Sequence, residues 1–200
     1  MKRLNVYIFF VLMKFTVATV FAQIATAPGV NQGEKAPRIR GMDQNGNSID
    51  SFELIGNGPF VLIFYRGSWC PYCRRHLGNL QDSLQLILDK GASVVVVTPE
   101  APESIKNMID QTQASFSIIQ DEDYKIMDDY GVSFRINELT VPRYLDGVLR
   151  KTRAANKNED DILPVPATFL IGKDHHVQYL HYDPDYRVRL PVSEILKRLG

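Results

Sequence analysis

The chain has few of the residues that hold metals or nucleic acids. Its 200 residues include two cysteines, one tryptophan and four histidines, and its formal net charge is zero. There is no second cysteine pair to complete a zinc site, and no block of Lys and Arg to bind nucleic acid. The sequence therefore predicts no cofactor, no resident metal and no nucleic-acid partner.

The amino-terminal residues 1–22 are typical of an export signal. Lys2 and Arg3 precede an apolar run, and the small residue Ala22 lies where a signal peptidase cuts. Cleavage would remove three cations and leave 20 basic against 23 acidic residues, a net charge of −3. We predict an exported, periplasmic protein. Because Lys14 interrupts the apolar run, a retained segment that tethers the chain to a membrane stays an alternative.

Residues 23–35 are polar and small, which predicts a linker, and residues 36–200 are expected to form one α/β domain. Its length and a hydrophobic content of 44% suffice for a single core. A β-hairpin is expected first, with Asn45-Gly46 as its type I′ turn. Apolar strands then alternate with amphipathic helices, which predicts a central mixed sheet flanked by helices. The expected strands are residues 60–65, 92–98, 116–119, 169–172 and 177–182, and the expected helices 71–90, 103–113, 121 or 123 to 130, 141–153 and 191–199.

The two cysteines lie where a buried strand gives way to a helix. Residues 60–65 are continuously apolar, and Pro71 suits the first position of a helix, so Cys70 lies at the helix N-terminus. We expect Cys70 at an exposed tip and Cys73 at the head of a buried stripe. That stripe consists of Cys73, Leu77, Leu80, Leu84 and Ile87.

This position gives the two thiols different roles. Unpaired N–H groups and the helix dipole stabilise a thiolate at Cys70, and Arg66, Arg74 and Arg75 add positive charge nearby. Residues three apart on a helix are neighbours, so the two sulfurs can form a disulfide. Cys70 is expected to attack, and Cys73 to resolve the mixed disulfide that results.

Other interpretations of the C-x-x-C motif stay open. It could be half of a zinc site, a structural disulfide, or the thiolate pair of a non-enzymatic carrier for a soft ion such as Cu(I). A loop this short gains little stability from a disulfide, and no histidine supplies a clear third metal ligand. Redox chemistry is therefore favoured, and an exported dithiol then needs an electron-donor thiol protein to keep it reduced.

Three segments carry a family resemblance: FYRGSWCPYC at residues 64–73, LPVPATFLI at 163–171 and HYDPDY at 181–186. They resemble the thioredoxin superfamily, in particular its alkyl hydroperoxide reductase/thiol-specific antioxidant, or peroxiredoxin-like, branch. The resemblance implies a thioredoxin-like fold over about residues 33–200. It also implies that Cys70 is the nucleophile, Cys73 the resolving thiol and Pro166 a cis-proline beside them.

Two positions depart from the peroxiredoxin pattern. Typical members have Thr or Ser three residues before the reactive cysteine, where this chain has Gly67, and an Arg before the late strand, where it has Pro166. Both groups polarise the O–O bond of a peroxide. The resemblance therefore implies an oxidoreductase that reduces disulfides, with peroxides as a further substrate and a dedicated thiol peroxidase as the alternative.

Three neighbours of the cysteines are expected to support them. Trp69 is expected to shield Cys70, and Tyr72 to lie exposed as a partner contact. Arg66 either pairs with the thiolate or reaches the solvent. His76 is expected on the surface, although a histidine there could shuttle a proton.

Overall fold

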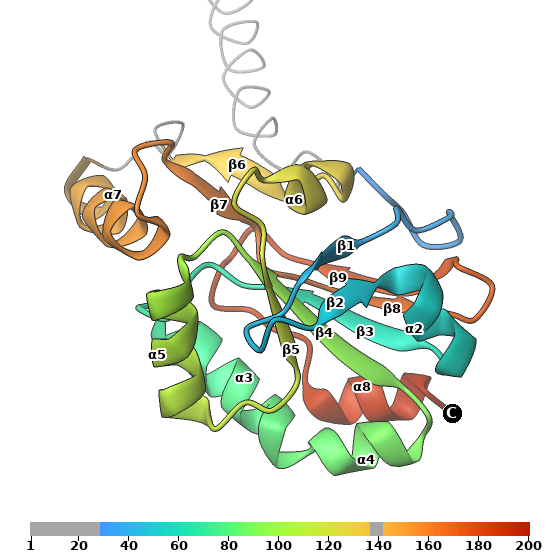
Figure 1. Ribbon diagram of the computed structural model, residues 1–200. Helices are drawn as coiled ribbons and strands as arrows, with labels where there is room; N and C mark the ends of the chain where they lie inside the picture. Colours follow the sequence, from blue (N-terminus) through green and yellow to red (C-terminus); the bar gives the residue numbers. More distant parts are fainter. Residues whose placement is uncertain (1–28, 137–141) are drawn as a thin grey trace, which may run out of the picture.

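The computed structural model describes residues 29–136 and 142–200, so the predicted export signal of residues 1–22 lies outside the described residues. A five-stranded sheet runs through the domain, with helices on both of its faces (Figure 1). Its strands, in spatial order, are β5 (Ser117–Gln120), β4 (Ser93–Thr98), β3 (Phe60–Phe64), β8 (Ala167–Ile171) and β9 (Val177–Tyr182).

The sheet is mixed, as the sequence predicts. Strands β3, β4 and β5 are parallel, whereas β8 runs antiparallel to β3, and β9 antiparallel to β8. Side chains of β3 alternate between two cores: Val61 and Ile63 face one, while Phe60, Leu62 and Phe64 face the other. A strand buried on both faces has no polar side, which explains its continuous apolar run.

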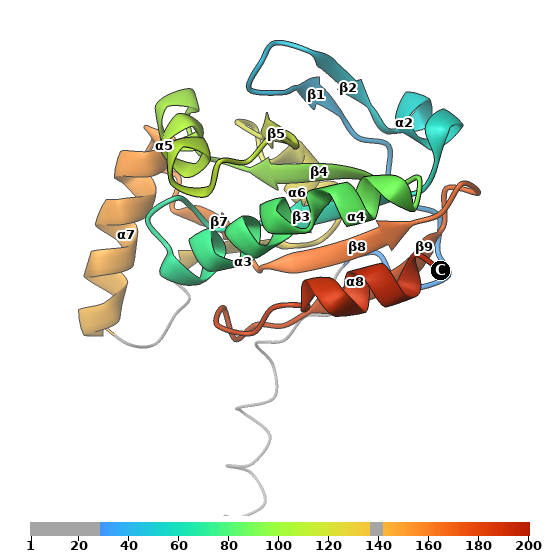
Figure 2. The ribbon, with the colours of Figure 1, turned by 90° about the horizontal axis from the view of Figure 1, so that it is seen from below.

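One face of the sheet packs against α3 (Pro71–Asp82), α4 (Leu84–Asp89), α5 (Pro102–Thr112) and α8 (Val192–Arg198). Figure 2 shows α3, α4 and α8 lying along the sheet on this side. The predicted stripe from Cys73 to Ile87 is buried here. The helix is interrupted at Ser83, whose N–H bonds the carbonyl of Leu80, so the single predicted helix forms two.

The other face packs against a hairpin, α2 (Ser51–Asn57) and α6 (Lys125–Asp129). Strands β1 (Arg40–Met42) and β2 (Ser48–Asp50) form the predicted hairpin. Its turn is not type I′, because that type needs a positive φ at both Asn45 and Gly46, and only Gly46 has one. The Gly46 N–H donates to the carbonyl of Asp43. Helix α2 is not predicted, although Asp50 caps it by accepting from the Phe52 N–H at 3.0 Å.

The chain joins the domain earlier than the predicted boundary at residue 36. The Gly29 N–H donates to the Tyr130 carbonyl at 3.1 Å, and the Gly33 N–H to the Val177 carbonyl at 2.8 Å. Val30 is buried in the core. The part of the predicted linker that the structure describes is therefore packed against the domain. Within the described ranges, no helix is long and apolar enough to cross a membrane.

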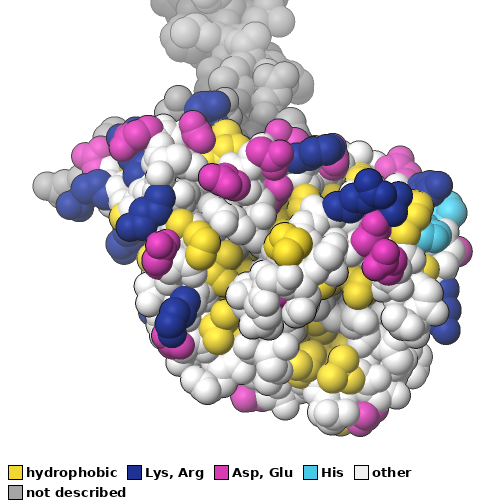
Figure 3. Space-filling view, viewed as in Figure 1, with side chains coloured by type: hydrophobic (Ala, Val, Ile, Leu, Met, Phe, Trp, Pro, Cys, Tyr) yellow, Lys and Arg dark blue, Asp and Glu magenta, His cyan; other side chains and the backbone are white. Residues whose placement is uncertain are grey.

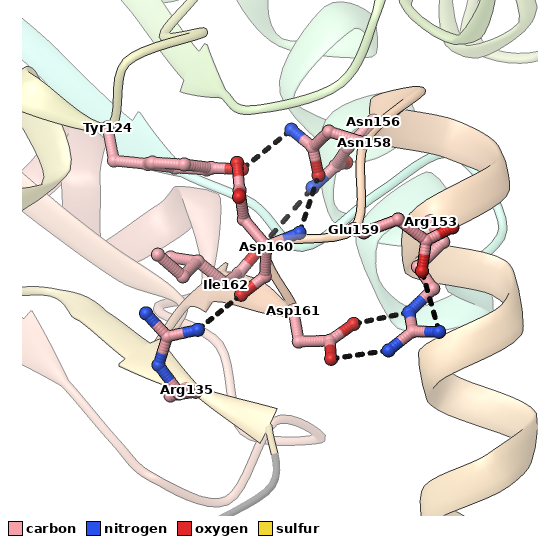
Figure 4. Close-up of polar contacts among 9 residues, drawn as sticks. All are labelled: Tyr124, Arg135, Arg153, Asn156, Asn158, Glu159, Asp160, Asp161 and Ile162. Carbon is pink, nitrogen blue, oxygen red and sulfur yellow. Dashed lines mark hydrogen bonds and ion pairs between the residues drawn. The ribbon is translucent and has the colours of Figure 1, made fainter.

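A second, smaller layer follows α6 in the chain. Strands β6 (Ser133–Arg135) and β7 (Ile162–Pro164) pair antiparallel, and α7 (Pro142–Asn156) lies between them in sequence. Polar contacts fix the loop after α7 (Figure 4): Arg153 holds Asp161 at 2.6 and 2.7 Å, and the Tyr124 hydroxyl donates to Asp160 at 3.0 Å. These bonds anchor the segment that enters β7 and then β8.

The buried stripe of α3 supports a prediction about stability. Leu80 is completely buried, so Leu80→Ala is expected to lower the free energy of unfolding by about 2–5 kcal/mol. Leu86→Ala in α4 is the matched control, because 54% of Leu86 is exposed, and we expect a much smaller change. Urea denaturation of both variants under reducing conditions measures the difference. Equal losses of stability would contradict this assignment of the core.

Candidate redox site

The loop from β3 to α3 places Cys70 at the start of the helix. The Cys70 N–H donates to the Gly67 carbonyl at 3.0 Å, and Cys70 has the extended backbone of an N-cap residue. Pro71 occupies the first turn, and the Cys73 and Arg74 N–H groups both donate to the Cys70 carbonyl at 3.1 Å. The local sequence thus starts the helix as predicted.

Both cysteines are reduced thiols and both are buried. Cys73 is completely buried, as expected, but only 1% of Cys70 is exposed, so its predicted place at an exposed tip is wrong. Both sulfurs belong to the apolar cluster of α3, and Trp69 and Tyr72 pack against that cluster as half-buried residues. The aromatic residues on either side of Cys70 therefore cover what the helix start alone would expose.

The surroundings of Cys70 favour its thiolate. Its pKa is lowered to about 6, chiefly by a hydrogen bond from the Cys73 thiol. Burial acts in the opposite direction, while the Cys73 N–H and the charges of Arg66 and Arg189 also lower the pKa. The thiolate of Cys70 therefore predominates over the thiol at neutral pH.

The surroundings of Cys73 act oppositely. Burial, and then the hydrogen bond and charge of Cys70, raise the pKa of Cys73 well above its ordinary value. Arg189 Nη2 donates to the Cys73 sulfur at 3.4 Å and partly offsets this rise. Cys70 is thus the more acidic of the two thiols, and Cys73 holds its proton more strongly.

Arg66 is a buried guanidinium held by aromatic rings. Only 2% of it is exposed, and its Cζ lies 4.5 Å from the ring centroid of Tyr186 and 5.2 Å from that of Trp69. In the described part of the chain, its Nε and Nη1 have no hydrogen-bond partner and no carboxylate pairs with it. Arg66 was expected either to pair with the thiolate or to reach the solvent. It is buried, and its charge lowers the pKa of Cys70.

Glu100 is a site residue that the sequence analysis does not identify. It is fully buried, and its Oε1 accepts from the Ser68 N–H at 2.7 Å and the Ser68 hydroxyl at 2.9 Å. Burial raises the pKa of Glu100, and the charge of Cys73 raises it further. Burial, and then the charge of Glu100, raise the pKa of Tyr65, and the Tyr65 hydroxyl in turn lowers that of Glu100. Because β4 is parallel to β3, the residues that follow the two strands meet at one edge of the sheet. Glu100 follows β4 as the cysteines follow β3, so its position after a predicted strand could have identified it from sequence.

Arg189 is the second residue missed. It belongs to the segment between β9 and α8, where its Nη1 donates to the Val188 carbonyl at 2.7 Å and also to the Tyr186 carbonyl. These bonds aim its Nη2 at Cys73. In sequence it is one of several charged residues in a loop, and nothing there distinguishes it from Arg187, which pairs with Asp185 at 2.7 Å.

One of the two departures from the peroxiredoxin pattern, Gly67, has a structural cause. A Cβ at Gly67 would lie 2.3 Å from Trp69 Nε1, so a threonine does not fit unless the indole moves.

Pro166 is buried just before Ala167, which pairs with Phe64 at the end of β3. The predicted cis bond is wrong, because every peptide bond in the described residues is trans. The chain is extended here: the Val165 N–H bonds the carbonyl of residue 132, at the end of the β6–β7 ladder.

His76 and Tyr72 also differ from expectation. His76 is buried rather than on the surface, and burial lowers its pKa to about 4, although its ring donates to the Leu190 carbonyl. Tyr72 is half-buried, with its ring 5.7 Å from that of Tyr186.

Over the residues that the structure describes, no group of three or more His, Cys, Asp or Glu side chains is placed to hold a metal ion.

Comparisons with known proteins place this arrangement in a family. The chain matches the model of the AhpC/TSA family over residues 32–180. It is 29% identical over 101 residues to the thiol-disulfide oxidoreductase ResA of Halalkalibacterium halodurans, which covers 50% of this chain and 56% of that protein. It is also 29% identical over 181 residues to the chloroplastic peroxiredoxin Q of Populus jackii, which covers 90% and 70% of the two chains.

Solved structures share the fold at low sequence identity. Peroxidoxin BcpB of Mycobacterium tuberculosis superposes with a TM-score of 0.66 at 16% identity, covering 85% of this chain and 96% of that one. A putative protein disulfide isomerase of Bacteroides thetaiotaomicron gives 0.61 at 15% identity, covering 88% and 92%. At such identities these likenesses show the fold alone.

The mixed sheet, with a cysteine pair at the start of α3, defines a thioredoxin-fold dithiol protein. The family match covers most of the chain, and the chain belongs to the AhpC/TSA family, which confirms the predicted resemblance. Its relatives are thiol-disulfide oxidoreductases and peroxiredoxins, so the predicted class of thiol-dependent redox enzyme is confirmed. The chain spans little more than half the length of the ResA relative.

The unequal thiols lead to a prediction about Cys70. Cys73→Ala is expected to raise the pKa of Cys70 from about 6 towards ~8.5, because the strongest of the effects that lower it is lost. Arg66→Met should raise it less, because the guanidinium charge contributes less. Titration of the thiolate's ultraviolet absorbance measures both shifts. Arg40→Met, in the hairpin on the other face of the sheet, is the control that should change nothing, and an unchanged pKa in Cys73→Ala would contradict the assignment.

Proposed function

We propose that the protein is a thiol–disulfide oxidoreductase that cycles Cys70 and Cys73 between dithiol and disulfide. The observation that carries this proposal is the position of Cys70 at the start of α3 with Cys73 buried in its first turn, which lowers the pKa of Cys70 to about 6 and raises that of Cys73. An attacking thiol ionised near neutral pH, next to a protonated thiol, is the arrangement that two-step exchange needs.

In the proposed cycle, the Cys70 thiolate attacks one sulfur of a substrate disulfide. A mixed disulfide forms, and the other substrate sulfur leaves as a thiolate. Cys73 then loses its proton and attacks Cys70 Sγ, which breaks the mixed disulfide and releases the second substrate thiolate. The substrate gains two electrons, and the chain ends with a Cys70–Cys73 disulfide. An electron-donor thiol protein returns this disulfide to the dithiol.

The second step needs a base for Cys73. We assign this role to Glu100, because it is buried, is held by Ser68 two residues before Cys70, and has a pKa that burial raises. Arg189, 3.4 Å from the Cys73 sulfur, stabilises the thiolate as it forms. Trp69, Tyr72 and Pro166 are assigned supporting roles, since two of them pack against the cysteine cluster and Pro166 precedes the strand that pairs with β3.

Peroxide reduction is the second candidate, and the match to peroxiredoxin Q favours it. Here the Cys70 thiolate would take one peroxide oxygen as a sulfenic acid and release an alcohol or water. Cys73 would then displace water and close the same disulfide. Gly67 and Pro166 offer no hydroxyl or guanidinium to polarise the O–O bond, so we assign peroxides a secondary place.

Turnover of insulin disulfides and of hydrogen peroxide, measured side by side, tests the proposal. We expect insulin reduction to be lost in both Cys70→Ser and Cys73→Ser, with slow peroxide turnover. Fast peroxide consumption that survives in Cys73→Ser but not in Cys70→Ser would instead establish a thiol peroxidase. If neither substrate turns over, the enzyme proposal fails, and the non-enzymatic Cu(I) carrier is tested next.

The pKa of Cys70 sets the expected pH dependence. Its folded pKa is depressed, so the thiolate is lost as pH falls through about 6. The rate of the first step should therefore rise with pH through a midpoint near that value and then level off. A midpoint near the ordinary pKa of ~8.5 would contradict the proposed activation.

Glu100→Gln tests the proposed base. The amide keeps an oxygen for the Ser68 hydrogen bonds but accepts no proton, so the second step should slow at least tenfold while the first step is little changed. Mass spectrometry of quenched reactions should then show the mixed disulfide on Cys70 accumulating. Glu103→Gln, at an exposed position of α5, is the matched control. Equal lifetimes of the mixed disulfide in both variants would rule out this role.

We also propose that the protein is exported and cleaved after Ala22, on the basis of the amino-terminal sequence. Expression of the full chain, followed by mass measurement of the secreted or membrane fraction, tests this. A mature protein that begins at Gln23 supports the proposal, and an intact chain in the membrane fraction would support the tether instead.

A further inference from the structure

A partner must approach the dithiol across a rim of residues that cover it. Because 1% or less of each cysteine is exposed, a substrate sulfur has to contact the surface around them first. Trp69 and Tyr72, both half-buried, form the apolar part of this rim. The charged side chains beside them therefore influence which partners arrive.

Cations at this rim are not paired with carboxylates. Lys151 Nζ, from α7, lies 6.0 Å from the Trp69 ring, and Arg74 donates to the Ser68 carbonyl at 3.1 Å. Arg75 is exposed one position further along α3. Within the described ranges, these three and Arg189 form no ion pair. Lys151, Arg74 and Arg189, from three separate elements, thus place positive charge beside the residues that cover the sulfurs.

Elsewhere, many cations are neutralised by a carboxylate. On the hairpin side of the molecule, basic and acidic side chains lie next to one another (Figure 3). The ion pairs there and around the remaining surface include Arg38 and Arg40 with Asp50, Lys106 with Asp110, Lys125 with Asp129, and Arg198 with Glu194. The unpaired charge at the rim is therefore not a property of the whole surface.

Three carboxylates near the rim are already engaged, and a fourth, Asp146, lies beside cations outside the rim. Asp185 pairs with Arg187 at 2.7 Å, and Asp183 accepts from the Asp185 N–H at 2.8 Å. Glu100 is buried beneath Ser68. Asp146, on α7, borders a surface hollow together with Arg150 and Arg153. No described carboxylate pairs with the rim cations, so the partner can supply the negative charge.

We infer that the redox partner is a polypeptide whose disulfide is flanked by Asp or Glu side chains, which contact the cationic rim formed by Arg74, Arg75, Lys151 and Arg189. This inference rests on the proposed function and names its substrate class. The exchange itself is unchanged: the peptide disulfide is reduced to two thiols as Cys70 and Cys73 are oxidised to a disulfide. Charges at such a rim chiefly raise the association rate, and salt screens their effect.

Three cyclic peptides that differ only in the residues flanking one disulfide test the inference. The flanks are Asp/Glu, Asn/Gln or Lys, and kcat/KM is measured at increasing salt. At low salt we expect the acidic peptide to be reduced about tenfold faster than the basic one, with a difference that shrinks as salt rises. Lys151→Glu and Arg75→Glu should each reduce or reverse the preference.

Lys173→Glu is the matched control, because Lys173 is also exposed and unpaired within the described residues but lies in the turn between β8 and β9. Equal rates for the three peptides, or an equal change in Lys173→Glu, would overturn the inference while leaving disulfide reduction intact. If no peptide and no insulin is reduced, the proposed function fails first. Should a Glu variant misfold, Lys151→Gln and Arg75→Gln provide the same test with half the charge change.

Discussion

The Arg66 guanidinium, buried without a carboxylate, is the constraint on which the rest of the site depends. A charge removed from water needs either a partner ion or a strongly polarisable surface, and two aromatic rings supply the second. The anion that can complete the arrangement is the Cys70 thiolate. The reduced protein therefore has a matched pair of charges, while the disulfide form leaves the cation with the rings alone.

Sheet topology determines which groups surround that pair. Strands β3 and β4 are parallel and end at the same edge, so the loop that leads to Cys70 and the residues that follow Thr98 are neighbours. Glu100, after β4, and the cysteines, after β3, meet at this edge. The segment after β9, which runs antiparallel to β8, brings Arg189 to the same place. Each group lies just beyond the end of a strand, which is why three segments distant in sequence form one compact site.

Much of this could be predicted from sequence because the signals are local. A continuous apolar run, a proline after Cys70 and a stripe at helical spacing were sufficient to predict β3, α3 and the place of Cys70 at the start of that helix. Burial of Cys70 and His76 was not predictable, because it results from Trp69, Tyr72 and the segment before α8 folding over the helix start. Arg189 was missed for the same reason: its role depends on a loop path rather than on its neighbours in sequence.

Contact between Gly67 and the Trp69 indole links two positions that sequence comparisons would treat separately. A side chain at residue 67 collides with the indole, so a substitution there requires the Trp69 side chain to move or residue 69 to change. A hydroxyl that could help activate a peroxide therefore cannot be introduced at residue 67 without altering the position or the identity of Trp69. This epistasis forms a barrier in sequence space between exchange-type and peroxidase-type active sites built on the same backbone.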